Sequence, residues 1–480
     1  MIALENKKVL VLGLSPSGIA AARFLVECGA DVVLLDGSNT SELAKAAKDA
    51  DLSKITVKLG ATTLPKQNFD FAVVAPEISL RDRLLLEAKE KEIPVIGEIE
   101  LGYQQSLCLN IAVTGTNGKT TTAQIIEQVL THCHRKTVIS DEASAPLTSL
   151  ISKTKELDFL TLEVSSFQLE HTTFFRPTIA VFLNTAQDHL DRYESMAQYI
   201  GTKARIFQNQ QPFDWAIVQS EVLAQLRALN LPVPAKVITF SANNRRADIF
   251  LDRGLIVSRL EDWAGPLLNM EHCKIRGPHN AESLMAALAV GRVLRLPLEQ
   301  TAEALKNYEL PPHRFELVAE VNGVKFINDS KSTNVGALHR ALLSIPEGRA
   351  GEPNVWLIAG GRDKRFDFHD IGPLLSRRVK GAFLMGEARE KIRAAWSLFT
   401  PCTLVDSLLI AVSDATKLAA AGDIILLSPA CSSFDQFRGY QHRGEVYRRA
   451  VADLVRTTGG GGEGGDHQKM DGKPESEVSR

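Results

Sequence analysis

Residues 111–122, with the sequence Ile-Ala-Val-Thr-Gly-Thr-Asn-Gly-Lys-Thr-Thr-Thr, decide how this chain is predicted to fold. An apolar segment runs into a glycine-rich turn, and a helical pattern follows with one apolar face formed by Ile125, Ile126, Val129 and Leu130. This order of strand, turn and helix is typical of a loop that binds nucleotide phosphates. The alternative is a plain tight turn that carries a surface lysine.

The residue types in this turn suit phosphate chemistry. Gly115 and Gly118 allow the backbone to close around phosphate oxygens. Lys119 offers a positive charge to the β- and γ-phosphates, and the Thr120 hydroxyl is a ligand for Mg²⁺. Two residues separate the glycines, so the loop is shorter than the common GxxxxGK[ST] pattern. The predicted ATP-binding loop consists of Gly115, Thr116, Asn117, Gly118, Lys119, Thr120 and Thr121.

Two later apolar strands also end in polar residues. The strand predicted at 159–162 leads to Glu163, and the strand at 179–183 leads to Asn184 and then to Asp188 and His189. Carboxyl ends of parallel strands meet at one edge of a sheet. We therefore expect Glu163 and His189 to face the same phosphates and to hold a metal ion, although each alone is also compatible with an ordinary surface position.

The first hundred residues alternate strand and helix, with strands at 9–12 and 32–35 around a helix at 19–27. The turn at 13–18 places backbone N–H groups at a helix N-terminus, where an anion binds well. Ser15 stands where the GxGxxG pattern has the glycine that contacts a pyrophosphate. A phosphate ligand other than NAD is therefore favoured over NAD, and a purely structural turn remains an alternative.

The last third of the chain repeats the pattern of an apolar strand followed by a polar loop. These loops occupy residues 328–331, 360–364 and 428–433 and present Asp, Lys and Ser side chains. Such a surface suits a small anionic substrate, while solvated loop polarity is the simpler alternative. Cys431 is predicted to be a small buried residue with no catalytic role.

The chain length and the positions of proline and glycine residues predict the domain organisation. A chain of 480 residues corresponds to about three domains, and the pair Pro311-Pro312 reads as a short stiff linker. The stretch from Gly459 to Arg480 begins with a glycine run and has almost no large apolar residue, which predicts a disordered tail. We expect an α/β protein with domains at 1–106, 107–310 and 311–458.

Composition excludes several functional classes. The chain has 55 Lys and Arg against 57 Asp and Glu, so nothing draws the whole molecule to nucleic acid or to an acidic membrane. Six cysteines without a CxxC pair favour free thiols in a reducing cytosol. No apolar run approaches the ~18 residues of a membrane span, and no signal peptide is evident. We expect a cytoplasmic, soluble protein that acts on small molecules.

Four segments together resemble the Mur ligase family, and the resemblance extends over nearly the whole chain up to about residue 456. They are Leu-Glu-Val-Ser-Ser-Phe-Gln-Leu at 162–169, Asp-His-Leu-Asp-Arg-Tyr at 188–193, Asn-Asp-Ser-Lys-Ser-Thr-Asn at 328–334 and Ser-Pro-Ala-Cys-Ser-Ser-Phe-Asp-Gln-Phe at 428–437. The phosphate loop alone fits several members of the family. The block at 328–334 favours the branch that adds D-glutamate.

The resemblance implies a fold and an activity. The expected fold has an N-terminal Rossmann-like domain for a uridine nucleotide, a central P-loop-type ATPase with a mostly parallel sheet, and a C-terminal Rossmann-like domain for the amino acid. The expected enzyme is a monomer that uses ATP and Mg²⁺ to join D-glutamate to UDP-N-acetylmuramoyl-L-alanine through an acyl phosphate. This step belongs to cytoplasmic peptidoglycan precursor synthesis.

The resemblance also implies roles for individual residues. Lys203, in the segment 199–206, matches a lysine that the family carbamylates to serve a second Mg²⁺. The metal ligands or their neighbours would be Thr120, Glu163, His189 and the carbamate of Lys203, with Lys119 beside them in the catalytic group. Residues on the ATP side would be Asn280, His313, Arg314, Asp329 and Lys331. The D-glutamate pocket would contain Thr333, Lys364, Ser433 and Tyr440. The uridine site would contain Ser17, Asp36 and Ser38.

Two segments depart from the family pattern. Residues 140–147, Ser-Asp-Glu-Ala-Ser-Ala-Pro-Leu, replace a Gly-Asn-Ile-Gly-like segment near the alanyl carboxyl group, and Ala75-Pro76-Glu77 replaces a Ser-Pro-Gly loop near the uridine phosphates. These departures keep open a nucleotide-sugar-binding or regulatory protein of the same fold with impaired catalysis. A Mur ligase for a different amino acid is a further alternative. A dinucleotide-dependent oxidoreductase is disfavoured by Ser15.

Overall fold

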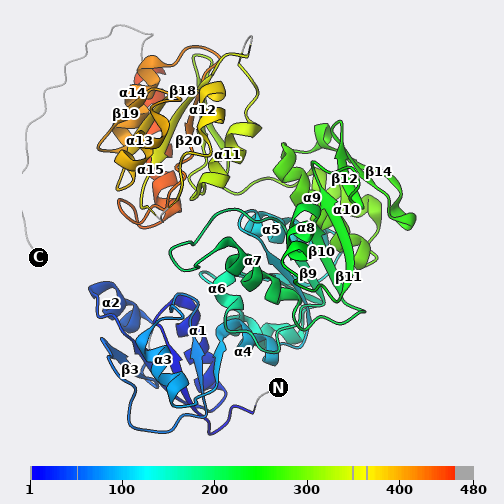
Figure 1. The fold of residues 1–480 in the computed structure, drawn as a ribbon, viewed down its shortest axis with the longest axis vertical. Helices are drawn as coiled ribbons and strands as arrows, with labels where there is room; N and C mark the ends of the chain where they lie inside the picture. The colour runs from blue at the N-terminus through cyan, green and yellow to red at the C-terminus, as the bar shows by residue number, and fades with distance from the viewer. Residues whose placement is uncertain (1–2, 51, 349–350, 364–365, 460–480) are drawn as a thin grey trace, which may run out of the picture. The chain divides into compact units, whose positions relative to one another are not determined.

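The strands form three β-sheets within residues 3–50, 52–348, 351–363 and 366–459, which the computed structural model describes (Figure 1). Most strand pairs are parallel, which confirms the predicted α/β class. The chain divides into two compact units at Pro311 and Pro312, with the first two sheets in one unit and the third sheet in the other. Helix α11 (Val335–Ser344) groups with the first unit. The domain boundaries predicted from the sequence remain a prediction.

The first sheet has the strand order β3-β2-β1-β4-β5, and every pair in it is parallel. Its strands are β1 (Lys8–Leu12), β2 (Asp31–Asp36), β3 (Thr56–Leu59), β4 (Phe71–Val74) and β5 (Val95–Gly97). Its helices are α1 (Pro16–Glu27), α2 (Ser41–Asp49) and α3 (Arg83–Glu90). Helix α1 begins three residues before the predicted position, because Ser15 accepts the N–H of Gly18 as an N-cap and Pro16 suits the first helical turn.

The central sheet has nine strands in the order β14-β13-β12-β11-β10-β9-β6-β8-β7. They are β6 (Leu109–Thr114), β7 (Thr137–Ser140), β8 (Phe159–Glu163), β9 (Ile179–Phe182), β10 (Trp215–Gln219), β11 (Lys236–Ser241), β12 (Ile249–Asp252), β13 (Leu255–Ser258) and β14 (Gly265–Asn269). Within this sheet, the described pairs β12–β13 and β13–β14 are antiparallel and the others are parallel. The strands predicted from residues 111, 159 and 179 are thus confirmed as parallel neighbours in one sheet, in the order β9-β6-β8.

Helices cover both faces of the central sheet. They are α4 (Glu98–Gln105), α5 (Lys119–His132), α6 (Ser166–Leu169), α7 (Met196–Ala204), α8 (Ser220–Ala228), α9 (Pro278–Val293) and α10 (Leu298–Lys306), with the 3₁₀ helix η1 (Leu147–Lys155). Ile111 and Val113 pack in one core with α5 and α9, whereas Ala112 packs in the opposite core with Leu160 and Leu162. Burial on both faces explains the nearly continuous apolar sequence of these parallel strands.

The third sheet has the order β15-β16-β20-β17-β18-β19, with β15 and β16 antiparallel and the other pairs parallel. Its strands are β15 (Glu316–Val321), β16 (Val324–Asn328), β17 (Val355–Gly360), β18 (Val379–Met385), β19 (Cys402–Leu404) and β20 (Ile424–Leu427). Its helices are α12 (Gly372–Arg378), α13 (Arg389–Trp396), α14 (Leu408–Leu418) and α15 (Tyr440–Gly459). Gly459, the first residue of the tail predicted at 459–480, is the last residue of α15, and the rest of that tail lies outside the described residues.

Across the described ranges, no helix combines the length and the apolar character that a membrane crossing requires.

Glu98, the first residue of α4, is a buried carboxyl group that ties α4 to η1. Its Oε1 accepts the backbone N–H and the hydroxyl of Thr148, both at 2.7 Å. Its Oε2 is buried and has no hydrogen-bond partner among the described residues. Burial raises the pKa of Glu98 from 4.5 to about 7, and the charges of Glu142 and Glu77 act in the same direction. The folded protein therefore binds a proton at Glu98 over a pH range in which the unfolded chain does not.

Proton binding at Glu98 predicts a pH-dependent difference in stability between the native protein and Glu98→Gln. Because the folded pKa is raised, stability falls as pH rises from about 4.5 through about 7. Glutamine stays neutral. From pH 5 to pH 8, the free energy of unfolding of the variant should therefore rise relative to that of the native protein by an amount on the order of 2–3 kcal/mol. Urea unfolding at pH 5 and at pH 8 measures this change. The exposed Glu90→Gln is the control, and parallel pH profiles for Glu98→Gln and native protein would contradict the assignment.

Candidate nucleotide and substrate site

The loop between β6 and α5 has the conformation expected of a phosphate-binding turn. Gly118 has φ 85° and directly precedes α5, and Gly115 has φ 153°. A Cβ atom at Gly115 would lie 3.0 Å from the Cβ atom of Leu183. Only glycine adopts these conformations readily. The backbone N–H groups at the start of α5 are therefore presented at the turn, where they attract anions.

Asn184, the second residue after β9, fixes the phosphate loop from the neighbouring strand. Its Oδ1 accepts the N–H of Asn117 and its Nδ2 donates to the carbonyl oxygen of Asn117, both at 3.0 Å. Its own carbonyl oxygen accepts the N–H of Thr116 at 3.0 Å. The two strand ends thus hold the loop in shape without any ligand.

Thr120 and Glu163 meet at the carboxyl ends of β6 and β8. The Thr120 hydroxyl donates to Glu163 Oε2 at 2.7 Å. Both groups offer oxygen atoms, the ligand type that Mg²⁺ prefers. Among the residues that the structure describes, no three His, Cys, Asp or Glu side chains gather closely enough to hold a metal unaided. Thr120 and Glu163 thus bring two oxygen atoms together at the carboxyl edge of the sheet.

Two lysines from different helices converge on one carbonyl oxygen. Lys119 Nζ, on α5, donates to the Gly115 carbonyl oxygen at 2.9 Å, and Lys203 Nζ, on α7, donates to the same oxygen at 3.1 Å. Lys203 is only 1% exposed, and its Nζ lies 4.9 Å from the centre of the Tyr199 ring. Burial lowers the pKa of Lys203 well below its usual value, and the charge of Lys119 lowers it further. The structure thus places the Lys203 amine beside the phosphate loop in surroundings that favour its neutral form.

His189 lies beside a buried carboxylate. Its backbone has φ 55°, its Nε2 is 3.7 Å from Asp188 Oδ1, and its ring contacts the edge of the Phe167 ring with centroids 4.6 Å apart. A shared metal for Glu163 and His189 stays a prediction.

The predicted uridine residues lie around the first glycine turn. Asp36, at the end of β2, accepts the N–H of Leu14 at 2.9 Å and the N–H of Ser38 at 2.8 Å. The fully buried Ser17 donates its hydroxyl to the carbonyl oxygen of Glu142 at 2.8 Å. Asp36 and Ser38 are thus brought together, whereas Ser17 is bonded to the segment 140–147 of the central region.

Both departures from the family pattern lie in this area. Glu142 Oε2 accepts the hydroxyl of Ser165 at 2.7 Å, just after β8. Arg192 pairs with Glu170 and also donates to the carbonyl oxygens of Pro76, at 3.0 Å, and of Ile78, at 2.8 Å. Arg192 therefore holds the loop that contains Glu77 against the central region.

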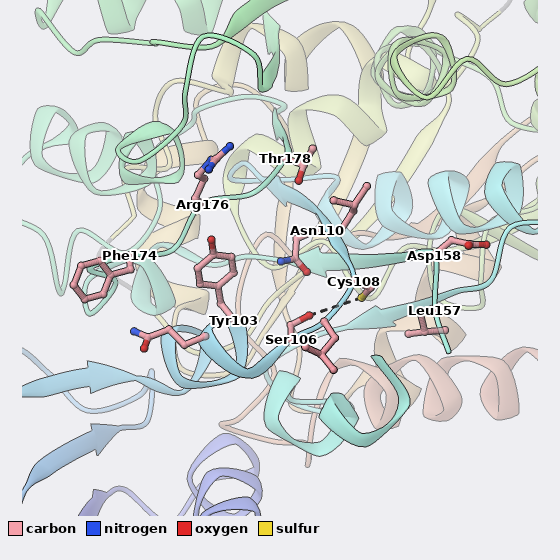
Figure 2. Close-up of a pocket in the computed structure, with 12 residues that line it drawn as sticks. Tyr103, Ser106, Cys108, Asn110, Leu157, Asp158, Phe174, Arg176 and Thr178 are labelled. Atoms are coloured by element: carbon pink, nitrogen blue, oxygen red, sulfur yellow. Dashed lines mark hydrogen bonds between the residues drawn. The ribbon is translucent and has the colours of Figure 1, made fainter. Parts of the chain in front are cut away.

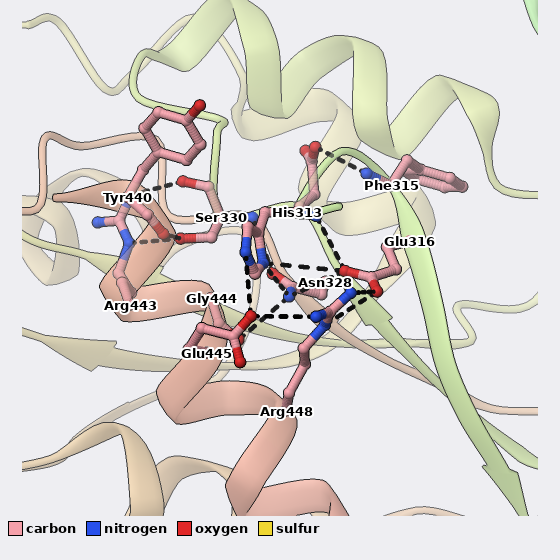
Figure 3. Close-up of polar contacts among 11 residues, drawn as sticks. His313, Phe315, Glu316, Asn328, Ser330, Tyr440, Arg443, Gly444, Glu445 and Arg448 are labelled. Atoms are coloured by element: carbon pink, nitrogen blue, oxygen red, sulfur yellow. Dashed lines mark hydrogen bonds and ion pairs between the residues drawn. The ribbon is translucent and has the colours of Figure 1, made fainter. Parts of the chain in front are cut away.

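In the third sheet, a polar network connects β15 and β16 to α15 (Figure 3). The His313 ring Nδ1 lies 2.9 Å from Asn328 Nδ2, and the His313 N–H donates to Glu316 Oε2 at 2.9 Å. Glu316 also forms an ion pair with Arg448. Burial and the charge of Arg448 lower the pKa of His313. The network fixes the loop that enters the sheet.

The block at 328–334 is held by a buried arginine of α15. Arg443 is fully buried and donates to Ser330 Oγ at 3.0 Å, to the Ser330 carbonyl oxygen at 2.8 Å and to the Cys431 carbonyl oxygen at 3.1 Å. It thereby joins two segments about a hundred residues apart. Burial raises the pKa of the Cys431 thiol to about 12, in keeping with the prediction of a buried cysteine.

The other predicted site residues each make contacts within their own part of the chain, and their roles stay predictions. Asp329 Oδ2 accepts the hydroxyl of Ser428 at 3.0 Å. Lys331 Nζ donates to the Tyr440 hydroxyl at 3.3 Å, although the two residues were predicted for different ligands. Asn280, in the first turn of α9, donates to the carbonyl oxygen of Arg276 at 2.8 Å. Ser433 is buried, and Arg314 and Thr333 are partly exposed. Lys364 lies outside the described residues.

Sequence reasoning singled out neither Tyr199 nor Arg443, and it read Asn184 only as the end of a strand. Arg443 and Asn184 act on loops that are distant in the sequence, so no local pattern indicates their roles. The Tyr199 hydroxyl is 3.2 Å from Thr116 Oγ1. Tyr199 lies four residues before Lys203, and this helical spacing indicates that the two side chains share one face of the helix.

Three family models match consecutive parts of the chain. The Mur ligase MurD-like N-terminal domain matches residues 7–97, the Mur ligase middle domain matches residues 113–291, and the Mur ligase glutamate ligase domain matches residues 313–431.

Two relatives are similar over almost their full length, and both are named UDP-N-acetylmuramoylalanine–D-glutamate ligase. The protein from Acidobacterium capsulatum is 36% identical over 452 residues, which cover 93% of this chain and 96% of the relative. The protein from Geotalea uraniireducens is 38% identical over 458 residues, which cover 94% of this chain and 98% of the relative.

Solved structures share the fold at low identity. A MurF ligase from Thermotoga maritima in complex with ADP has a TM-score of 0.60 and 16% identity, and the match covers 95% of this chain and 100% of that one. The UDP-N-acetylmuramate-alanine ligase from the same organism has a TM-score of 0.57 and 16% identity, with 94% and 100% covered.

Proposed function

The chain belongs to the Mur ligase family, and on this premise we propose that it joins D-glutamate to UDP-N-acetylmuramoyl-L-alanine at the expense of ATP. The observation that carries the proposal is the 36–38% identity, over 93–94% of the chain, to relatives named for that reaction. The block at 328–334, which favours the D-glutamate branch, supports the choice of amino acid. We further propose that the enzyme works as a monomer in the cytoplasm.

The phosphate loop supplies the ATP site in this proposal. The N–H groups at the start of α5 and the ammonium of Lys119 meet the β- and γ-phosphates. Asn184 holds the loop in its binding shape before ATP arrives, so little ordering is needed on binding. Asn280, His313, Arg314, Asp329 and Lys331 remain proposed ATP-side residues.

Thr120 and Glu163 would hold Mg²⁺ between them and the phosphates, since their oxygen atoms already lie 2.7 Å apart at one edge of the sheet. Bound there, Mg²⁺ would neutralise charge as the acceptor carboxylate takes up the γ-phosphoryl group. His189, beside Asp188, is proposed as a further ligand or neighbour of the ion.

We propose that Lys203 reacts with carbon dioxide to form a carbamate. Only a neutral amine attacks carbon dioxide, and burial together with Lys119 favours that form. The amine nitrogen bonds to the carbon atom and releases a proton to solvent, so the side chain changes from a donor to an anion with two oxygen ligands. A hard cation prefers such a group to an ammonium.

Amide formation then needs the D-glutamate amine close to the acyl phosphate. Thr333, Lys364, Ser433 and Tyr440 are proposed to hold D-glutamate, and the Lys364 ammonium is proposed to pair with one of its carboxylates. The route requires no nucleophile from the protein, and the raised pKa of Cys431 leaves its thiol protonated.

An ADP-release assay tests this function. We expect ADP only when ATP, Mg²⁺, UDP-N-acetylmuramoyl-L-alanine and D-glutamate are all present, because phosphoryl transfer and amine attack are coupled. Comparable release with L-lysine or D-alanine would contradict the amino-acid specificity. Tight binding of the uridine nucleotide without any ADP release would instead favour a catalytically impaired binding protein, in which Glu142 and Glu77 alter the acceptor site.

Lys364→Ala should weaken the use of D-glutamate selectively. In the sequence, Lys364 comes shortly after Gly360, the last residue of β17, and it is proposed to contact the amino-acid substrate. Loss of a charge-assisted contact should raise the KM for D-glutamate roughly tenfold to a hundredfold and leave the KM for ATP nearly unchanged. Lys417→Ala, an exposed lysine paired with Asp414, is the matched control. An unaltered KM for D-glutamate in Lys364→Ala would remove Lys364 from the pocket.

A further inference from the structure

The strand order of the first sheet, β3-β2-β1-β4-β5, reverses direction between β1 and β4. In a parallel sheet, ligands bind outside the carboxyl ends of the two strands at such a reversal. Two loops lie there, the glycine turn 13–18 after β1 and the loop 75–78 after β4. They pack closely, because a Cβ atom at Gly13 would lie 2.9 Å from Cβ of Ala75 and 3.0 Å from Cγ1 of Ile78. The position of loop 75–78 therefore shapes this ligand-binding end of the first sheet.

A guanidinium group from the central region holds loop 75–78. Arg192 donates from Nη1 to the carbonyl oxygen of Pro76 at 3.0 Å and from Nη2 to that of Ile78 at 2.8 Å. Its Nε and Nη2 also form a two-point ion pair with Glu170, at 3.0 and 2.5 Å. Both side chains are largely buried, with 10% of Arg192 and 2% of Glu170 exposed. Because the planar group is paired at two points, its orientation is set, and it fixes the backbone of the loop.

The same guanidinium also contacts the carboxyl edge of the central sheet. The Cζ atom of Arg192 lies 4.1 Å from the centre of the Phe167 ring. Phe167 contacts the edge of the His189 ring, with centroids 4.6 Å apart, and it follows Glu163 by four residues. One buried side chain thus connects loop 75–78 of the first sheet to the residues beside Glu163.

Helix α4 joins the first and central sheets independently of Arg192. Leu101 packs in the core of the first sheet, and Ile99 packs in a core of the central sheet. The end of α4, at Tyr103, borders a cavity of about 970 Å³ at the amino end of β6 (Figure 2). We therefore expect the two sheets to stay joined when the contacts of Arg192 are lost, with loop 75–78 released from the central region.

We propose that Arg192 is a positioning residue, which sets the place of loop 75–78 relative to Glu163 and so brings the acceptor carboxylate to the γ-phosphate. The inference rests on the proposed ligase function, in which the acceptor, UDP-N-acetylmuramoyl-L-alanine, binds with its nucleotide at the first sheet. Arg192 acts through the loop and through Phe167, without contact to a substrate. A displacement of about 1 Å between reacting groups costs roughly a hundredfold in rate, so release of the loop should affect turnover as well as acceptor binding.

Arg192→Lys tests this role. Lysine keeps a positive charge beside Glu170, but its single ammonium cannot reproduce the bonds to Glu170 and to both carbonyl oxygens. Titration calorimetry without ATP should show the acceptor bound about tenfold more weakly than by the native protein. The kcat should fall about tenfold or more, whereas the Kd of ADP with Mg²⁺ should change by less than about twofold.

Arg81→Lys is the matched control. Arg81 and Glu194 lie close in sequence to Ile78 and Arg192, and they form an ion pair of 2.7 Å in which the side chains are 76% and 75% exposed. An exposed pair of this kind contributes little. Arg81→Lys should therefore bind the acceptor and turn over as the native protein does.

Chemical rescue of Arg192→Ala gives a second measurement. Alanine leaves space between Glu170 and Phe167, so methylguanidinium should restore part of the acceptor affinity and methylammonium should not. Equal rescue by the two cations would overturn the role of the planar group. If Arg192→Ala does not fold, Arg192→Lys still decides the question.

A role in stability alone predicts a different pattern. In Arg192→Lys, kcat would then fall only in proportion to the fraction of protein that binds ADP, and that fraction would bind the acceptor with native affinity. This pattern would overturn the proposal, as would the absence of acceptor binding by the native protein. A native protein that binds the acceptor but releases no ADP with D-glutamate would contradict the ligase function, while the comparison of acceptor affinities would still decide the role of Arg192.

Discussion

Lys203→Arg and Lys203→Ala are each expected to lower kcat by more than about a hundredfold, the range seen when a group that stabilises transition-state charge is removed. Arginine keeps a positive charge beside the phosphate loop and cannot become a carbamate. Alanine leaves no ligand at all. Since Lys119 donates to the same carbonyl oxygen as Lys203, the phosphate loop keeps a lysine contact in both variants, and the fold and much of the ATP affinity should be retained.

Two measurements link the loss of activity to the carbamate. They are the intact mass of the protein and the rescue of activity by a small carboxylic acid. The native protein should gain the mass of one molecule of carbon dioxide in bicarbonate buffer, and Lys203→Ala should not. A small carboxylic acid added to Lys203→Ala should restore part of the activity, because it supplies oxygen ligands in the space that alanine leaves. Lys91→Arg, a surface change at a lysine paired with Glu87, should retain native activity. Native-like turnover in Lys203→Arg would refute the carbamate.

Glu163→Gln is expected to have the second-largest effect. The amide retains the size of the side chain and still accepts the Thr120 hydroxyl, so the loop should keep its shape. It loses the negative charge that a hard cation needs. We expect kcat to fall by about a hundredfold or more, and the Mg²⁺ concentration for half-maximal activity to rise.

Magnesium titrations at saturating ATP measure this effect. Glu163→Asp, which keeps the charge on a shorter side chain, should regain part of the activity. Glu156→Gln, an exposed change in the same region, is the control. A Mg²⁺ dependence in Glu163→Gln identical to that of the native protein would exclude Glu163 as a ligand.

The parts of the site that could be predicted from the sequence are those set by local chemistry. The phosphate loop is one continuous segment with glycines where φ is positive and a helix directly after it, so its motif predicted its shape. The polar ends of β8 and β9 could be placed because parallel strands share one carboxyl edge. The alternation of apolar strands and helices along the sequence likewise predicted the α/β fold class.

The parts that could not be predicted depend on contacts between distant segments. Arg443 reads as a surface residue of a helix, yet α15 buries it against Ser330 and Cys431. Asn184 acts on Asn117, which lies 67 residues away. The local pattern shows Lys203 only as a lysine on a helix, and its burial follows from the packing of α7 near the phosphate loop. Neither composition nor periodicity indicates which distant residues will be in contact.

The most direct test of the central claim follows oxygen-18 from the alanyl carboxylate of UDP-N-acetylmuramoyl-L-alanine. With ATP, Mg²⁺ and D-glutamate present, an acyl phosphate transfers one of the two labelled oxygens to inorganic phosphate and leaves the other in the new amide. We therefore predict one labelled oxygen in each phosphate released and a product that contains D-glutamate. Unlabelled phosphate, or labelled phosphate without a D-glutamate product, would contradict the account.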